Sequence, residues 1–123
     1  MQTSCTPQTS AQIRANLAGM HPTDHIQIVT FRLAGLQHDD YAAHCEAVAP
    51  RFTQIDGLHA KAWIADARTN TYGGIYAWES EEAMDAYVRG PVFGALRSNS
   101  QIAAVSSRDF TVLEHPTRIT QRA

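Results

Sequence analysis

The chain has 123 residues, 44% of them hydrophobic and 18% charged, which is enough for one domain with one core but not for two. Its formal charge is −2 and its ten lysine and arginine residues are scattered, which argues against a nucleic-acid or anionic-membrane partner. No apolar run is long enough for a membrane span, and the N-terminal residues lack the pattern of a signal peptide. We therefore expect a cytoplasmic protein in which Cys5 and Cys45 stay reduced.

The beginning of the chain, residues 1–24, is a polar extension with weak patterning. Residues 12–20 (QIRANLAGM) have the composition for two helical turns, which Gly19 and Pro22 would end. A helix this short is marginal in isolation. We expect residues 1–24 to be an extension that is either flexible or packed on a partner.

A strand and a helix open the predicted domain. Residues 26–33 (IQIVTFRL) are rich in β-branched residues and are followed by Gly35, which predicts a strand. Asp39 or Asp40 then caps a helix over residues 41–52, whose end Pro50 can bend or fray. The apolar positions of this helix are spaced by four, three and four residues, so they form one face: Tyr41, Cys45, Val48 and Phe52.

A β-hairpin follows, with strands over residues 58–65 and 72–78 and a polar turn that closes across Arg68 and Thr69. The alternation puts aromatic and cationic residues on one face, in the pairs Trp63–Gly74, Lys61–Tyr76 and His59–Trp78. The opposite face is mostly small: Ala60, Ala62, Ile64, Gly73, Ile75 and Ala77. Because helices pack closely on a smooth surface, we expect them to cover the small face and to leave the aromatic face bare.

The second half of the chain predicts another helix and a last strand. Ser80 is a favourable N-cap, Glu81 and Glu82 suit the first helical turn, and Gly90-Pro91 ends the helix. Residues 92–97 form a short helical extension, and residues 102–114 form a long strand that Pro116 ends. We expect residues 115–123 to be a polar tail, so that residues 25–114 form the folded domain.

The predicted order is β-α-β-β-α-β, which is the order of a ferredoxin-like α+β fold with a four-stranded antiparallel sheet. Its bare face would carry Trp63, Tyr76 and Trp78, and an exposed aromatic patch of that kind predicts a partner. A two-fold homodimer that closes two sheets into a barrel is the simplest solution. Replacing Trp63 by alanine should then cost several kcal/mol and loosen dimerisation.

The hairpin also carries a family resemblance. It contains Gly-Leu-x-x-Lys-x-Trp at residues 57–63, Gly-Gly-Ile-Tyr-x-Trp at residues 73–78, and Ser-Glu-Glu-Ala at residues 80–83. These segments resemble the YdhR-type putative mono-oxygenases, small bacterial proteins of the dimeric α/β-barrel superfamily that also contains antibiotic-biosynthesis-monooxygenase-like proteins. The resemblance covers residues 26–113. It implies the same dimeric barrel and an apolar substrate held between sheet and helices.

No cofactor motif is present, because the sequence has no P-loop, G-x-G-x-x-G, C-x-x-C or G-x-S-x-G. His21 and His25 are four residues apart, but Pro22 disfavours a helix there and two ligands are too few for a metal site. We therefore expect no cofactor and no metal. The resemblance implies a base-assisted reaction of a small apolar aromatic or polyketide-like substrate with oxygen. A cyclase or isomerase, or a non-catalytic small-molecule-binding dimer, would use the same parts.

The candidate catalytic bases are His44, which borders the apolar helix face, and His59, which lies on the aromatic face. Each has a structural alternative, as a hydrogen-bonded boundary histidine or as an interface histidine. Arg32 and Lys61 are strand cations that could donate to reduced oxygen or form ion pairs, with Asp109 as a possible partner.

The predicted pocket lies between the first helix and the sheet. Its substrate-binding candidates are Tyr41, Val48, Arg32, Phe93, Trp63 and Tyr76, with His44 beside them. The small hairpin face forms the opposite wall, and Arg32 lies near the rim or on the other sheet face. Such a cavity stays open only if Phe52 and Phe93 hold the helix away from the sheet. His59 should point into the dimer barrel instead.

Overall fold

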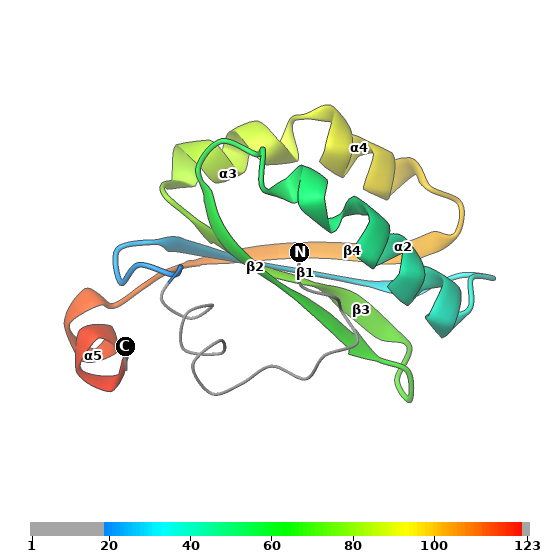
Figure 1. The fold of residues 1–123 in the computed structure, drawn as a ribbon, viewed down its shortest axis with the longest axis horizontal. Coiled ribbons are helices and arrows are strands. Elements are labelled where there is room, and N and C mark those ends of the chain that lie inside the picture. The colour runs from blue at the N-terminus through cyan, green and yellow to red at the C-terminus, as the bar shows by residue number, and fades with distance from the viewer. Residues whose placement is uncertain (1–18, 122–123) are drawn as a thin grey trace.

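The computed structural model describes residues 19–121. The predicted short helix over residues 12–20 therefore lies almost entirely outside the described residues. None of the helices in the described range is long and apolar enough to cross a bilayer. The elements, labelled as in Figure 1, are β1 (His25–Leu33), α2 (His38–Phe52), β2 (Leu58–Asp66), β3 (Thr71–Trp78), α3 (Glu81–Val88), α4 (Pro91–Ser98), β4 (Ile102–Thr111) and α5 (Glu114–Thr120).

The four strands form one antiparallel sheet in the order β2-β3-β1-β4. Helices α2, α3 and α4 lie on the same side of this sheet, and α5 lies apart from them near one end (Figure 1). The predicted ferredoxin-like α+β architecture is confirmed. Ser80 is the N-cap of α3, as predicted, and its hydroxyl accepts a hydrogen bond from the Ala83 N–H at 3.1 Å.

The predicted last strand over residues 102–114 is too long, because β4 ends at Thr111 and α5 follows. Pro116 falls in the first turn of α5, where a helix needs no N–H from it, so it does not exclude a helix. Glu114 also suits the N-terminal turn, and its carboxylate accepts a 2.9 Å hydrogen bond from Arg118 Nε one turn later.

The hairpin register is confirmed over most of its length. Lys61 pairs with Tyr76 and Trp63 pairs with Gly74, as the alternation predicts. At the start of β2 an irregularity places Leu58 opposite Trp78, so the predicted pairing of His59 with Trp78 is wrong. Gly73 has a φ of +153°, and a Cβ there would overlap the Val29 carbonyl on β1. Only glycine allows the two strands to approach at this point.

The predicted assignment of the two sheet faces is also wrong. The helices cover the aromatic face, where Tyr76 is 3% exposed and Trp78 is 0% exposed, and these residues belong to the core together with Tyr87 and Phe93. The face left open carries Ile75, which is 37% exposed. The reason is volume: a helix layer lies well above a sheet, and only large side chains fill that space to the packing density of a protein interior.

Candidate active site

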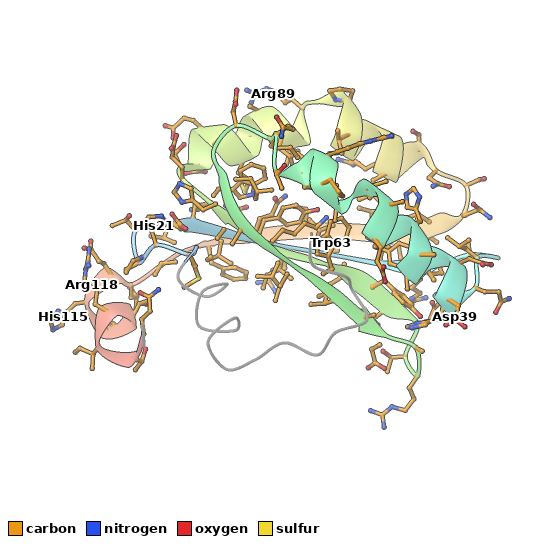
Figure 2. The ribbon with its side chains drawn as sticks, in the orientation of Figure 1. His21, Asp39, Trp63, Arg89, His115 and Arg118 are labelled. Atoms are coloured by element: carbon orange, nitrogen blue, oxygen red, sulfur yellow. The ribbon has the colours of Figure 1, made fainter. Side chains whose placement is uncertain are left out.

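A cavity of about 550 Å³ lies between α2, α4 and the covered face of the sheet. Figure 2 shows Trp63 in the space between the sheet and α2. Helix α2 contributes one wall, the sheet contributes the floor, and α4 contributes the far wall. The lining side chains include Tyr41, His44, Cys45, Val48, Arg51 and Phe52 from α2, Phe31, Lys61, Trp63 and Tyr76 from the sheet, Tyr87 from α3, and Val92, Ala95 and Leu96 from α4.

The cavity exists because α2 does not pack tightly on the sheet: no residue of α2 is buried. Two aromatic residues hold the helix at its ends. Tyr41 makes edge contacts with Phe31 and Tyr72, at centroid distances of 5.9 and 5.2 Å. Phe52 makes an edge contact with Trp63 at 5.0 Å. The prediction that Phe52 keeps the helix away from the sheet agrees with this geometry, whereas Tyr41, not Phe93, acts at the other end.

Lys61 supplies the floor of the cavity with a cation surrounded by aromatic rings. Its Nζ lies 3.3 Å from the ring centroid of Trp63, 3.8 Å from that of Phe52 and 4.7 Å from that of Tyr76. The Lys61 stem runs over Gly74, where an added Cβ would lie 2.8 Å from Lys61 Cε. Burial lowers the pKa of Lys61 from 10.5 to about 7, and the neighbouring Cys45 opposes this shift.

The tyrosines of the cavity are neutral hydrogen-bond donors. Burial, and then the hydrogen bond with Cys45, raise the pKa of Tyr41. Burial is also the main cause that raises the pKa of Tyr76, whose hydroxyl lies 3.1 Å from that of Tyr87. Burial raises the pKa of Tyr87, partly offset by its hydrogen bond with Tyr76. These phenols therefore stay protonated at physiological pH and present O–H groups rather than charges.

The structure brings together five of the predicted site residues and separates the other three. Those that line the cavity are Tyr41, His44, Val48, Trp63 and Tyr76. His44 is itself exposed, so it stands at the mouth rather than in the interior. Phe93 is 1% exposed and packs against Tyr87 in the core. Arg32 is exposed and alternates with the core residues Phe31 and Leu33, so it belongs to the open face of the sheet.

The predicted small wall of the pocket is wrong in the same way as the sheet faces. Among the small hairpin residues, Gly73 borders the cavity. Ala60, Ala62 and Ala77 alternate with the cavity-side residues of their strands and therefore point to the other face.

His59 lies in a separate cluster near the start of β2. Its Nδ1 is 2.8 Å from Asp24 Oδ1, and its ring lies 4.4 Å from that of His21. Asp24 is 2% exposed and also accepts a 2.8 Å hydrogen bond from the His21 backbone N–H. Figure 2 shows His21 at the end of the sheet away from the start of α2, which Asp39 marks. The cluster lies apart from the cavity-lining residues.

Asp109 pairs with His25 rather than with Arg32 or Lys61, at 2.7 Å between Oδ2 and Nε2. Together with Glu81 these two residues place three possible metal-ligand atoms within 4.8 Å of one another. Asp109 and Glu81 are exposed, and the His25–Asp109 ion pair already accounts for the closest approach. His21, the other histidine of the His21–His25 segment, does not join this cluster.

A family comparison identifies the chain over most of its length. The family model described as "Putative mono-oxygenase ydhR" matches residues 26–123. The chain belongs to this family. A comparison with functionally curated proteins gives no match.

Solved structures share the fold of this ydhR-family chain at low sequence identity. A protein of unknown function from Nitrosomonas europaea has a TM-score of 0.64 and 19% identity, over 76% of this chain and 92% of that one. The heme degrader MhuD from Mycobacterium tuberculosis, solved with two hemes bound in its active site, has a TM-score of 0.59 and 19% identity, over 72% and 95%. A conserved protein from Methanosarcina mazei has a TM-score of 0.55 and 10% identity, over 73% and 94%.

The residue that sequence reasoning underrated in this ydhR-family chain is Lys61. It is the single lysine of the sequence, because the other nine of the ten basic residues are arginines. The predicted register already placed it opposite Tyr76 and two residues from Trp63. A single lysine on an aromatic strand face suggests an amine with a special role. The sequence alone does not show whether helices cover that face.

Proposed function

We propose that the protein is a cofactor-independent mono-oxygenase that oxidises a small apolar aromatic or polyketide-like substrate in the cavity between α2, α4 and the sheet. The observation that carries the proposal is this cavity, of about 550 Å³ and walled by aromatic rings, in a chain of a mono-oxygenase family. Its volume falls in the range of sites for small molecules, roughly 300–1,000 Å³. The sequence supports cofactor independence because it contains no flavin or nicotinamide motif.

The reaction needs no external reductant when the substrate carries an activated methylene group. A base removes one C–H proton, the carbanion gives electrons to oxygen, and a C–O bond forms. Loss of the second proton and cleavage of the O–O bond then give the ketone and water. In balance, one methylene group and one dioxygen molecule give one ketone carbonyl and one water molecule, and the substrate supplies all the electrons.

The residues of the cavity suit these steps. His44 is the proposed base, because it lines the cavity and, being exposed, can exchange its proton with water. The Tyr41 hydroxyl and the Lys61 amine are donors for the developing charge on oxygen. The rings of Trp63 and Tyr76 provide apolar surface for a flat substrate.

The test is an incubation of the protein with anthrone- and quinol-like compounds, with and without oxygen, read by product mass. We expect an oxygen-dependent product that incorporates one oxygen atom from isotope-labelled dioxygen. His44→Ala should lower the rate by about 10²-fold or more while the protein remains folded. His59→Ala, in the separate cluster with Asp24, should retain activity.

Other outcomes identify the alternatives. A rearranged product that forms equally without oxygen indicates a cyclase or isomerase with the same base. Binding of these compounds without any product indicates a small-molecule-binding protein. Loss of activity in His59→Ala but not in His44→Ala contradicts the assignment of the base.

Heme is a competing occupant, because MhuD holds heme in its active site. The cavity fits such a group in one respect: His44 lines it, and a histidine is a common ligand of heme iron. Heme bound there would supply iron-based oxygen chemistry. Titration of the purified protein with hemin distinguishes the two occupants.

The proposal includes a homodimer that forms through the open face of the sheet, whose apolar residues include Ile75 and Phe110, 37% and 42% exposed. It also includes a cytoplasmic location. The Cys45 thiol beside the cavity is free, which suits a reducing compartment.

A further inference from the structure

The cavity is lined by cationic side chains and by no carboxylate of the described residues. Its titratable and charged lining residues are His44, Cys45 and Arg51 from α2, Lys61 from β2, and the tyrosines 41, 76 and 87. The lining residues that α4 contributes are all uncharged. Among the described residues that line this cavity there is no carboxylate. A bound group that carries or develops negative charge would therefore meet cations and O–H donors and no like charge.

Lys61 is the innermost of these cations. The ion pairs formed among the described residues use His25, His59 and Arg118, and none uses Lys61. Three aromatic rings surround its Nζ instead. A buried amine without a carboxylate partner is costly in its charged form, whereas the faces of the surrounding rings favour that form.

Burial lowers the pKa of Lys61 to about 7, which leaves the amine and the ammonium close in free energy near neutral pH. Lys61 can then accept a proton from a ligand of similar acidity. The rings of Phe52, Trp63 and Tyr76 stabilise the ammonium that results. An adjacent ligand anion would remove the remaining cost of burying the charge.

We propose that the cavity selects substrates with an acidic phenolic or enolic hydroxyl, and that Lys61 takes the hydroxyl proton on binding. The ligand O–H bond breaks, an N–H bond forms at Nζ, and the neutral pair becomes a phenolate or enolate beside an ammonium. The total charge of the complex does not change. The choice of substrate class rests on the proposed function, whereas the proton transfer requires neither oxygen nor turnover.

The test uses 4-nitrophenol, whose phenolate is yellow and whose phenol is not, bound under nitrogen at a pH below its own pKa. Wild-type protein should increase the phenolate-to-phenol ratio of the bound probe at least about tenfold over that in buffer, equivalent to one pKa unit. Lys61→Met keeps the apolar stem and removes the amine, so it should bind the probe without ionising it. Arg118→Met removes a cation of α5, which lies outside the cavity, and should ionise the probe as wild type does.

The other partner of the transfer can be followed directly, because isotope-labelled lysine gives a single side-chain signal in this chain. At about pH 8, where a pKa of about 7 leaves Lys61 of the free protein largely as the amine, the probe should move the Lys61 signal from the amine position to the ammonium position. Gly74→Ala retains the amine but displaces its stem, since the added Cβ would lie 2.8 Å from Cε, and should weaken probe ionisation.

Equal ionisation by wild type and Lys61→Met would overturn the proposal, as would binding of the neutral phenol alone. Failure of both 4-nitrophenol and a larger nitronaphthol to bind would overturn it too. A different result would refute only the proposed function. If the protein ionises the probe but no substrate gives an oxygen-dependent product, the cavity is a phenol-binding site without oxygenase activity.

Discussion

The Lys61 side chain has two parts in different surroundings. Its stem lies over Gly74, which has no side chain to compete for the space, and its amine lies among three rings. A long side chain normally carries its charge to water. At Lys61 the helix layer prevents this, because Phe52 of α2 lies over the amine at 3.8 Å.

This burial gives the folding stability a pH dependence that can be measured. The pKa of Lys61 is about 7 in the folded chain and near its ordinary value of 10.5 in the unfolded chain. Between these values the unfolded chain binds more protons, so stability increases with pH across this window, and below pH 7 the full cost of the buried charge is present. Lys61→Met should therefore be more stable than wild type, and its excess in unfolding free energy should be largest at low pH.

Urea unfolding of both proteins at about pH 6 and about pH 9 checks this. The difference in unfolding free energy between Lys61→Met and wild type should be smaller at the higher pH by roughly 2–3 kcal/mol. The other titrating groups are common to both variants and cancel. A difference that stays constant between the two pH values would show that Lys61 has an ordinary pKa.

At the scale of elements, the sequence predicts α2 and its inward face well but not what that face meets. Spacing alone identifies Tyr41, Cys45, Val48 and Phe52 as one stripe, and all four line the cavity. Alternation likewise separates the two faces of the hairpin, and most of its register is correct. Alternation carries no information on which face the helices cover, because that depends on the volume between the layers.

Two further features required the three-dimensional structure. Phe93 has helical spacing suited to the cavity, yet α4 directs it to Tyr87 and the core. His59 loses its predicted partner Trp78 because of the irregularity at the start of β2, and it pairs with Asp24 instead. The first depends on how α4 packs against α3, and the second on a contact between residues 35 positions apart in sequence. Local patterns encode neither.

Because no residue of α2 is buried, the space beneath it can be filled without moving the helix far. Val48 lines this space, so Val48→Trp should fold with an unfolding free energy within about 1.5 kcal/mol of wild type. The same variant should lose binding of 4-nitrophenol and any oxygenase turnover, because the indole occupies the ligand volume. Equilibrium unfolding and probe binding measure the two effects.

Val48→Ala is the matched control, since it enlarges the same cavity and should retain probe binding. Wild-type affinity in Val48→Trp would place the ligand elsewhere. The nearest alternative is the smaller groove of about 340 Å³ between α2 and the β2–β3 hairpin, which shares Tyr41, Cys45 and Trp63 with the cavity.

At the scale of the whole molecule, purified protein should contain neither heme nor stoichiometric transition metal. The sequence offers no cofactor motif and no dense ligand set, which motivates the expectation. Elemental analysis and hemin titration check it, with no change expected in the hemin spectrum. Bound metal would contradict it, and Glu81→Gln would then test the His25–Glu81–Asp109 cluster. A hemin spectrum that changes with wild type but not with His44→Ala would instead favour heme in the cavity.

The proposed homodimer would form across the open face of the sheet. The predicted dimer patch of Trp63, Tyr76 and Trp78 lies beneath the helices of its own chain, so it cannot form the interface. Exposed apolar residues occupy the opposite face instead: Ile75 pairs with Ile28 in the centre of the sheet, and Phe110 on β4 pairs with Ile26 at one end. A flat apolar sheet surface of this kind is stabilised when a second copy covers it.

Ile75→Asp should therefore convert a homodimer of the 13.5 kDa chain into a monomer, because dimerisation would bury an unpaired carboxylate. Analytical ultracentrifugation measures the mass of both forms. Trp63→Ala is the control from the covered face: it should lose stability through the cavity it leaves, yet remain a dimer. A monomeric wild type, or an Ile75→Asp variant that stays dimeric while Trp63→Ala dissociates, would show that the copies do not meet across the open face.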